Sequence, residues 1–146
     1  MEKSIKKIIA YTLDKLDMDS DAARELIFAT GKAESGYRAL EQMGGPAVGF
    51  FQVEPATIQD VWDNYVFYRP QIKLDLYALG LDDSNMELSV MGSIILQAAF
   101  ARLQYRRVKD PLPSVGDLEA QGKYWKQFYN TELGRGTIEH FLKANK

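Results

Sequence analysis

The feature that most limits how this chain can fold is an apolar segment near its centre, SVMGSIILQAAFARLQYRR (residues 89–107). Projected on a helix, the middle of this segment carries apolar side chains on nearly every side, so the helix must be enclosed by other elements. We expect this helix to begin within DDSNMEL (residues 82–88), where Ser84 and Glu87 have the spacing of a capping box. The segment therefore predicts a domain built of helices packed around a central one.

The remaining sequence supports this all-α prediction. Apolar residues at three- and four-residue spacings predict a first helix between Ile5 and Leu16, and a second, capped by Ser20 or Asp21, that runs to Glu34. Further helices are expected from Pro55, from a cap at Ser114 and over IEHFLKAN (residues 138–145). Residues 36–53 lack helical spacing and contain MGGPAVG, which favours turns. We expect one domain, residues 1–146, with a small loop or hairpin insertion.

Composition excludes several classes of function. The 146 residues contain no cysteine, which rules out disulfides, thiolate zinc sites and cysteine nucleophiles. The net charge of -2 argues against a nucleic-acid binder. No metal or cofactor motif is present, and we find neither a signal peptide nor a membrane-spanning segment. We expect no cofactor, no metal, no nucleic-acid partner and no membrane insertion.

Glu34 is the strongest candidate for chemistry. It continues the apolar helical stripe formed by Ala23, Leu26, Ile27 and Thr30. A carboxylate placed against apolar neighbours loses hydration, so its pKa rises and it can hold a proton near neutral pH, as a general acid must. The alternative is that the helix has frayed by this position and the side chain is solvated.

The glycine-rich segment GGPAVGFFQ (residues 44–52) follows this acid. Gly49 permits close approach of the backbone to a ligand, Phe50 and Phe51 are consecutive aromatics, and Gln52 can both donate and accept hydrogen bonds. Such groups beside an acid suit a sugar. The alternative is a short hairpin whose phenylalanines fill the core.

These residues also carry a family resemblance. Glu34–Ser35 followed by AVGFFQVEPAT (residues 47–57) resembles the Glu-Ser … Gly-Ala-x-Gly-Leu-Met-Gln-Ile-x-Pro-x-Thr pattern of soluble lytic transglycosylases, relatives of goose-type lysozyme. The resemblance implies a lysozyme-like fold, Glu34 as the catalytic acid, and Ser35, Gly49 and Gln52 beside the substrate. Phe50–Phe51 stand where the family has Leu-Met, and Pro46 replaces its first loop glycine, which affects substrate positioning.

A second block supports the resemblance. YWKQFYNTELGRGT (residues 124–137) is similar to the late Tyr-Asn-x-Gly motif of that family, with an insertion before its glycine. The resemblance implies that the Tyr129 hydroxyl orients Glu34 and that Asn130 holds the loop. The alternative is a helix end that Asn130 caps. This block, with AAFARLQYRR…PLP before it, also resembles transglycosylase-like proteins of tailed phages.

The function implied is cleavage of the β-1,4 bond between N-acetylmuramic acid and N-acetylglucosamine in peptidoglycan. In the transglycosylase route one glutamate suffices, because it protonates the glycosidic oxygen and then takes the proton of the sugar's own 6-hydroxyl, giving a 1,6-anhydro product. A hydrolase normally needs a second carboxylate, for which Glu41, Glu54, Asp60 and Asp63 are candidates.

Two alternatives stay open: a hydrolytic muramidase on the same fold, and a phage structural or glycan-binding protein without activity. The expected partner is the peptidoglycan glycan strand, joined by other phage proteins if the chain is carried in a virion. The protein would be made in the host cytoplasm and act at the cell wall, as an endolysin or a virion component.

Three other features favour structural roles. The segment RLQYRRVK (residues 102–109) is expected to be the solvated end of the long helix rather than an anion or nucleic-acid site. His140, the single histidine, is expected at the surface or in packing. Trp62 and Trp125 are expected in helix cores rather than as platforms for sugars.

Overall fold

A computed structural model describes residues 1–38, 49–131, 134 and 136–146 of the chain. This described part is all-α and contains no sheet, which confirms the fold class. Its elements are α1 (Glu2–Lys15), α2 (Asp21–Glu34), α3 (Pro55–Asn64), the 3-10 turn η1 (Val66–Tyr68), α4 (Pro70–Ala78), α5 (Met86–Met91), α6 (Ile94–Arg106), α7 (Leu118–Trp125), the π-helical turn η2 (Lys126–Asn130) and α8 (Ile138–Ala144).

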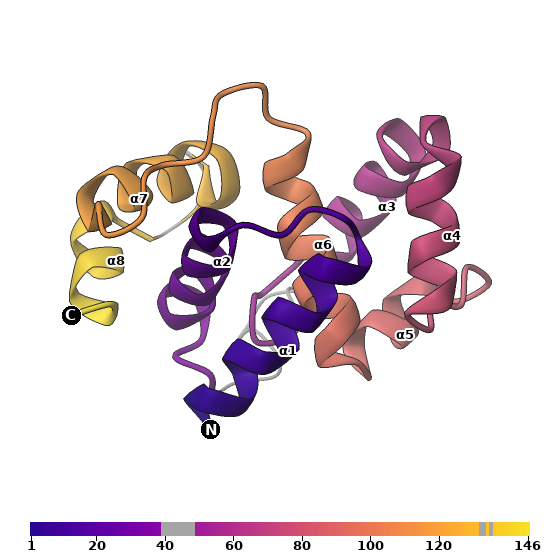
Figure 1. Ribbon diagram of the computed structural model, residues 1–146, viewed down its shortest axis with the longest axis horizontal. Coiled ribbons are helices and arrows are strands. Elements are labelled where there is room, and N and C mark those ends of the chain that lie inside the picture. Colours follow the sequence, from indigo (N-terminus) through magenta and orange to yellow (C-terminus); the bar gives the residue numbers. More distant parts are fainter. Residues whose placement is uncertain (39–48, 132–133, 135) are drawn as a thin grey trace.

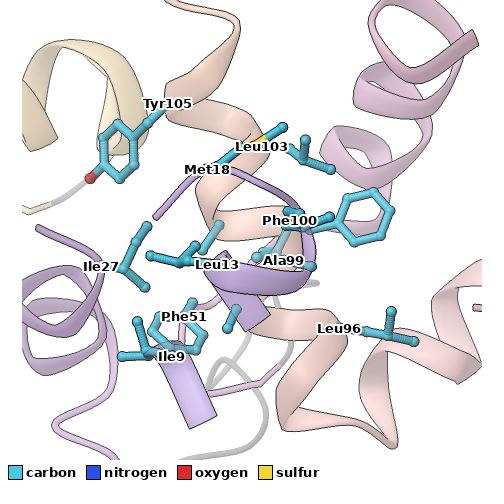
Figure 2. Close-up of a cluster of buried hydrophobic side chains, with 14 of the residues drawn as sticks. Ile9, Leu13, Met18, Ile27, Phe51, Leu96, Ala99, Phe100, Leu103 and Tyr105 are labelled. Carbon is cyan, nitrogen blue, oxygen red and sulfur yellow. The ribbon is translucent and has the colours of Figure 1, made fainter. Parts of the chain in front are cut away.

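The central helix predicted from the sequence is α6. Every residue from Leu96 to Tyr105 is buried. In Figure 1, α6 runs through the middle of the molecule, with α2, α7 and α8 on one side and α3, α4 and α5 on the other. Figure 2 shows its side chains in one cluster with Ile9 and Leu13 of α1, Ile27 of α2 and residues between the helices. Burial on all sides explains why this helix lacks a polar face.

The predicted single helix over residues 82–107 is instead two helices. At Ser93 the backbone is extended, with φ -141° and ψ 112°, which ends the run of helical dihedrals after α5. The Ser93 hydroxyl then accepts a hydrogen bond from Leu96 N (3.1 Å) and caps α6. The predicted capping box is also shifted by one residue, because Asn85 rather than Ser84 caps α5.

The other helix limits follow their caps. Ser20 caps α2 by accepting from Ala23 N (3.0 Å), which settles the choice left open by the sequence. The predicted cap at Ser114 is wrong, because Asp117 accepts from Ala120 N (3.0 Å) and α7 begins after it. The carboxylate is the better partner here, since it also meets the positive end of the helix dipole.

The expected loop or hairpin insertion falls largely on residues 39–48, outside the described residues. The described part of that region, residues 49–53, connects to α3 and lies against α6 through the buried side chains of Phe51 and Val53. Within the described ranges, no helix is both long enough and apolar enough to cross a membrane.

Candidate active site

Glu34 is the last residue of α2 and is partly exposed. The stripe predicted to lead to it is confirmed, because Ala23, Leu26, Ile27 and Thr30 are each at most 1% exposed. The helix continues to Glu34 rather than fraying before it. The carboxyl group therefore stands where a buried helix face reaches the surface.

Trp125, at the end of α7, holds the carboxyl group of Glu34. Its indole Nε1–H donates to Glu34 Oε2 at 2.9 Å. The indole ring is itself 1% exposed and packs in a small cluster with Ala29 and Ala33 of α2 and Phe141 of α8. Because side chains of three helices hold the ring in place, its N–H is a preorganised donor. It bonds to one oxygen of the Glu34 carboxyl group and leaves the other oxygen without this bond.

The pKa of Glu34 is raised from 4.5 to about 7. Burial, which penalises the charged form, is the largest cause, and the charge of Glu54 acts in the same direction. The hydrogen bond from Trp125, the charge of His140 and the side-chain amide of Asn130 each lower the pKa. The outcome is a carboxyl group that is about half protonated near neutral pH, so it can either give or take a proton.

The hydroxyl of Tyr129 does not contact Glu34 in the way the resemblance implied. It donates instead to Phe51 O at 2.6 Å, and the ring stacks on Tyr105 with centroids 5.2 Å apart. Burial raises the pKa of Tyr129, and the charge of Glu34 raises it further. Tyr129 thus fixes the loop beside the acid rather than the acid itself.

Asn130 lies at the end of η2. Its Oδ1 accepts a hydrogen bond from Lys126 Nζ at 2.8 Å, and the same ammonium donates to Gly134 O at 3.1 Å. This arrangement joins Asn130, through Lys126, to the segment that follows η2, whereas its expected hold on the glycine-rich loop stays a prediction, because residues 44–48 lie outside the described residues. Because its amide also acts on the pKa of Glu34, Asn130 belongs to the surroundings of the acid.

Residues 49–52 form a tight turn fastened to both α2 and α6. The hydroxyl of Ser35 donates to Phe50 O at 2.6 Å, and Phe50 N donates to Gln97 Oε1 at 3.2 Å. Gly49 has φ +81°, and a Cβ at this position would lie 2.5 Å from Gln97. The glycine is therefore required both by the backbone and by the close approach of α6. Gln52, with φ 50°, closes the turn by donating from Nε2 to Gly49 O at 2.7 Å.

The phenylalanine rings of this turn lie in the core, which corrects the expectation that they contact substrate. Phe50 is 8% exposed and Phe51 is fully buried. Both rings meet Tyr37 edge-on, with centroids 5.6 and 6.0 Å away. The core therefore surrounds these rings, and their backbone carbonyls hold the site together. Gln52 is the residue of this turn whose side chain is partly exposed.

The four candidates for a second carboxylate are distinguished by their positions. Asp60 pairs with Arg107 at 2.6 Å, and Asp63 accepts a hydrogen bond from a side chain of its own helix. Glu54 is exposed at the N-terminus of α3, and its charge raises the pKa of Glu34. Glu41 falls outside the described residues. Of the three described candidates, Glu54 is the one whose charge acts on the pKa of Glu34.

Three residues around the site were not predicted to be there from the sequence. Two of them act on Glu34, and the third binds the turn over residues 49–52. Trp125 is a core residue as predicted, but no pattern indicated that its N–H would reach residue 34. His140 is exposed as predicted, yet its Nε2 lies 2.7 Å from Ala33 O, so α8 is attached beside the acid. Gln97 was a polar residue within an apolar helix, and that exception was the available signal for a buried hydrogen bond.

Comparison of the chain with protein-family models, with curated proteins and with solved structures returned no match. In the parts of the chain that the structure describes, no group of three or more histidine, aspartate or glutamate side chains is arranged to hold a metal ion.

Proposed function

We propose that this protein cleaves the β-1,4 bond between N-acetylmuramic acid and N-acetylglucosamine in peptidoglycan, by the transglycosylase route, with Glu34 as acid and then base. The observation that supports this best is a partly exposed carboxyl group with a pKa of about 7, held through one oxygen by a buried indole N–H. A group of this kind is suited to giving a proton and then taking one back at neutral pH.

The reaction needs only this acid. Protonated Glu34 gives its proton to the glycosidic oxygen from the carboxyl oxygen that Trp125 does not occupy, and the C1–O bond breaks as the leaving sugar becomes an alcohol. The 6-hydroxyl of the same muramic acid residue attacks C1 and loses its proton to the Glu34 carboxylate. The product carries a 1,6-anhydro ring, and the acid is again protonated.

The turn over residues 49–52 is suited to hold the glycan beside the acid. Its carbonyls are fixed by Ser35 and Tyr129, so its backbone keeps one shape while substrate binds. Gln52 presents a side-chain amide at the surface of this turn. Positioning of the sugar by rigid backbone and one amide would supply the orientation that glycosidic cleavage requires.

The hydrolytic alternative has one specific observation in its favour, which is the charge of Glu54 acting on Glu34. A second carboxylate near the acid could activate water for attack at C1. The two routes differ in their products, because hydrolysis leaves a reducing end and the transglycosylase route leaves an anhydro end that is lighter by one water.

The experiment that tests the proposal is mass spectrometry of soluble products after purified peptidoglycan is digested by the parent, Glu34→Gln and Glu54→Gln. Anhydro products from the parent and Glu54→Gln, absent with Glu34→Gln, are the expected result. Reducing ends that disappear in both variants would replace the proposal by a hydrolytic muramidase. If the parent cleaves nothing between pH 5 and pH 8, the proposed enzymatic activity is contradicted. Co-sedimentation of the protein with the wall would then test glycan binding.

The proposed activity implies where the protein acts. A peptidoglycan-cleaving protein works at the cell wall, so the glycan strand is the proposed partner. Whether the protein acts there as a free endolysin or as part of a phage particle is decided by fractionation of purified virions.

A further inference from the structure

The outward face of α4 is apolar, although this helix lies at the surface of the molecule. Leu76 of α4 is fully buried in the core, whereas Leu74 and Tyr77 of the same helix are 59% and 38% exposed. Figure 1 shows α4 at the edge of the molecule, across α6 from α2 and α7, which carry Glu34 and Trp125. A surface helix ordinarily turns polar side chains to water, so an apolar outward face indicates a surface that a partner covers.

The turn before α4 extends this face. Phe67 and Tyr68 of η1 are 60% and 69% exposed, and their rings meet edge-on with centroids 5.1 Å apart. The ammonium of Lys73 lies over the rings of Trp62 and Phe67, at 5.3 and 5.5 Å, and so joins η1 to α3 and α4. We call the exposed apolar side chains of this surface the α4 patch, which consists of Phe67, Tyr68, Leu74 and Tyr77.

The α4 patch lies in an acidic part of the chain. Residues 55–91 contain six carboxylates and two cations, a net charge of -4. Asp83 borders the patch directly, because its Oδ2 accepts a hydrogen bond from the Tyr77 hydroxyl at 2.7 Å, and Asp75 follows Leu74 on α4. Among the described residues, neither of these two carboxylates forms an ion pair. A partner that fits this surface therefore presents cations beside apolar groups.

The exposed side of α1 is a surface of this kind on the same chain. Side chains four residues apart lie along one side of a helix, and here they form what we call the lysine row: Lys3, Lys7, Tyr11 and Lys15. The Tyr11 ring is 50% exposed, and the ammonium of Lys15 lies 5.5 Å from its centroid. Counting the exposed Asp14 on this side, α1 has four lysines and two carboxylates, a net charge of +2. In the part of the chain that the structure describes, no lysine of the row is in an ion pair.

Another group of cations, at the end of α6, fits the patch less well. Arg106, Arg107 and Lys109 are exposed, as expected from the sequence. Arg102 is only 5% exposed, which corrects that expectation for this residue alone. Arg107 is already paired with Asp60 at 2.6 Å, and residues 106–109 include no exposed apolar side chain. This group therefore offers charge without the apolar contact that the α4 patch requires.

We propose that the lysine row of one copy of this chain docks on the α4 patch of a second copy, so that the protein associates with itself through two different surfaces. The Tyr11 ring adds to the aromatic side chains of the patch, and the lysines meet the carboxylates at its margin. Contact between two α4 patches would bring two acidic surfaces together, and an anionic lipid surface would meet the same repulsion. Neither surface contains Glu34, and the proposal is independent of glycan cleavage.

Sedimentation velocity of the parent over a concentration series tests this contact. A small apolar area flanked by exposed charges predicts weak association, so the mean mass should rise above that of the monomer between roughly 10 µM and 1 mM protein in about 50 mM salt. Salt at about 0.5 M screens exposed charges and should raise the concentration at half-association several-fold. A parent that stays monomeric throughout, or an association that salt does not weaken, would overturn the proposal.

Two variants remove one surface each. The double variant Lys3→Glu with Lys7→Glu reverses the charge of the lysine row, and Leu74→Lys places a cation in the α4 patch. All three positions are exposed, so the fold should be retained, and each variant alone should be monomeric. Mixed in equal amounts, the two variants should form a 1:1 complex, because each supplies the surface that the other lacks.

Matched changes at exposed positions elsewhere serve as controls. Val115→Lys, and the double variant Lys143→Glu with Lys146→Glu, alter an apolar side chain and two lysines outside both surfaces and should associate as the parent does. If Leu74→Lys lowers the thermal midpoint, Tyr68→Lys on η1 replaces it.

Three results with the variants would overturn the proposal. Continued association of the lysine-row variant would mean that the α4 patch pairs with itself. Continued association of Leu74→Lys and of Tyr68→Lys would remove the patch from the contact. A mixture that stays monomeric would show that the two surfaces do not bind one another.

Discussion

Replacing Glu34 with glutamine separates the chemistry of this carboxyl group from its effect on stability. The pKa is about 7 in the folded protein and 4.5 for the same group in water. These values differ by about 2.5, and each unit corresponds to about 1.4 kcal/mol, so ionising Glu34 within the fold costs up to about 3 kcal/mol. Glutamine has the same shape, can accept from Trp125 and cannot ionise.

The direction of the pH dependence of stability follows from whether the folded or the unfolded state of the parent ionises first. Below pH 4.5 both the folded and the unfolded parent hold the proton, and the parent has its full stability. Between pH 4.5 and 7 the unfolded chain ionises while the folded one does not, so the parent loses stability, and the loss is complete above pH 7. Glu34→Gln has no such loss and should exceed the parent by up to roughly 10 °C in thermal midpoint at pH 8.5, and match it near pH 4.

The assay combines thermal midpoints at pH 4 and pH 8.5 with the rate of wall lysis, on the parent, Glu34→Gln and the exposed control Glu139→Gln. Lysis by Glu34→Gln should fall by roughly 10²–10⁴-fold. A midpoint difference that is the same at both pH values would refute the raised pKa. Full lysis would refute the catalytic role, and a large loss of stability at both pH values would show a structural anion instead.

Three further predictions concern groups around the acid. Trp125→Phe removes a donor that lowers the pKa of Glu34, so the alkaline limb of the pH–rate profile should move up by roughly one unit; an unmoved limb would exclude this influence. Tyr129→Phe frees the carbonyl of Phe51 and should slow lysis about ten- to a hundredfold, whereas unchanged turnover would leave the tyrosine a packing role. Gly49→Ala should lower the free energy of unfolding by about 1–3 kcal/mol in urea titrations, since its φ is positive; an unchanged midpoint would mean that this turn is not rigidly held.

The elements of the fold were largely predictable because they depend on local pattern. The enclosed helix, the cap at Ser20 and the stripe ending at Glu34 all follow from spacing and side-chain type, which act over a few residues. The two errors at caps, Ser84 and Ser114, share a cause. Several polar residues near each helix start can serve as the N-cap, each for a different backbone N–H, and packing decides at which one the helix begins.

The site was predictable only in part, because its acid is local and its partners are not. Apolar spacing placed Glu34 on a buried face, and that is enough to anticipate a raised pKa. The donor from Trp125 depends on how α7 packs against α2, which no short-range pattern encodes. Arg102 was mispredicted for a different reason. A charged residue near a helix end was expected in solvent, whereas this side chain lies in the interior.

The hydrogen bond between Glu34 and Trp125 joins residues that are 91 positions apart in the chain. During synthesis, α2 is completed long before α7, so the carboxylate first exists as an ordinary hydrated acid. It acquires its proton affinity only when the late helices dock and exclude water from it. Under the proposed function, a nascent or locally unfolded chain would therefore not cleave the wall, and activity would report the completion of folding.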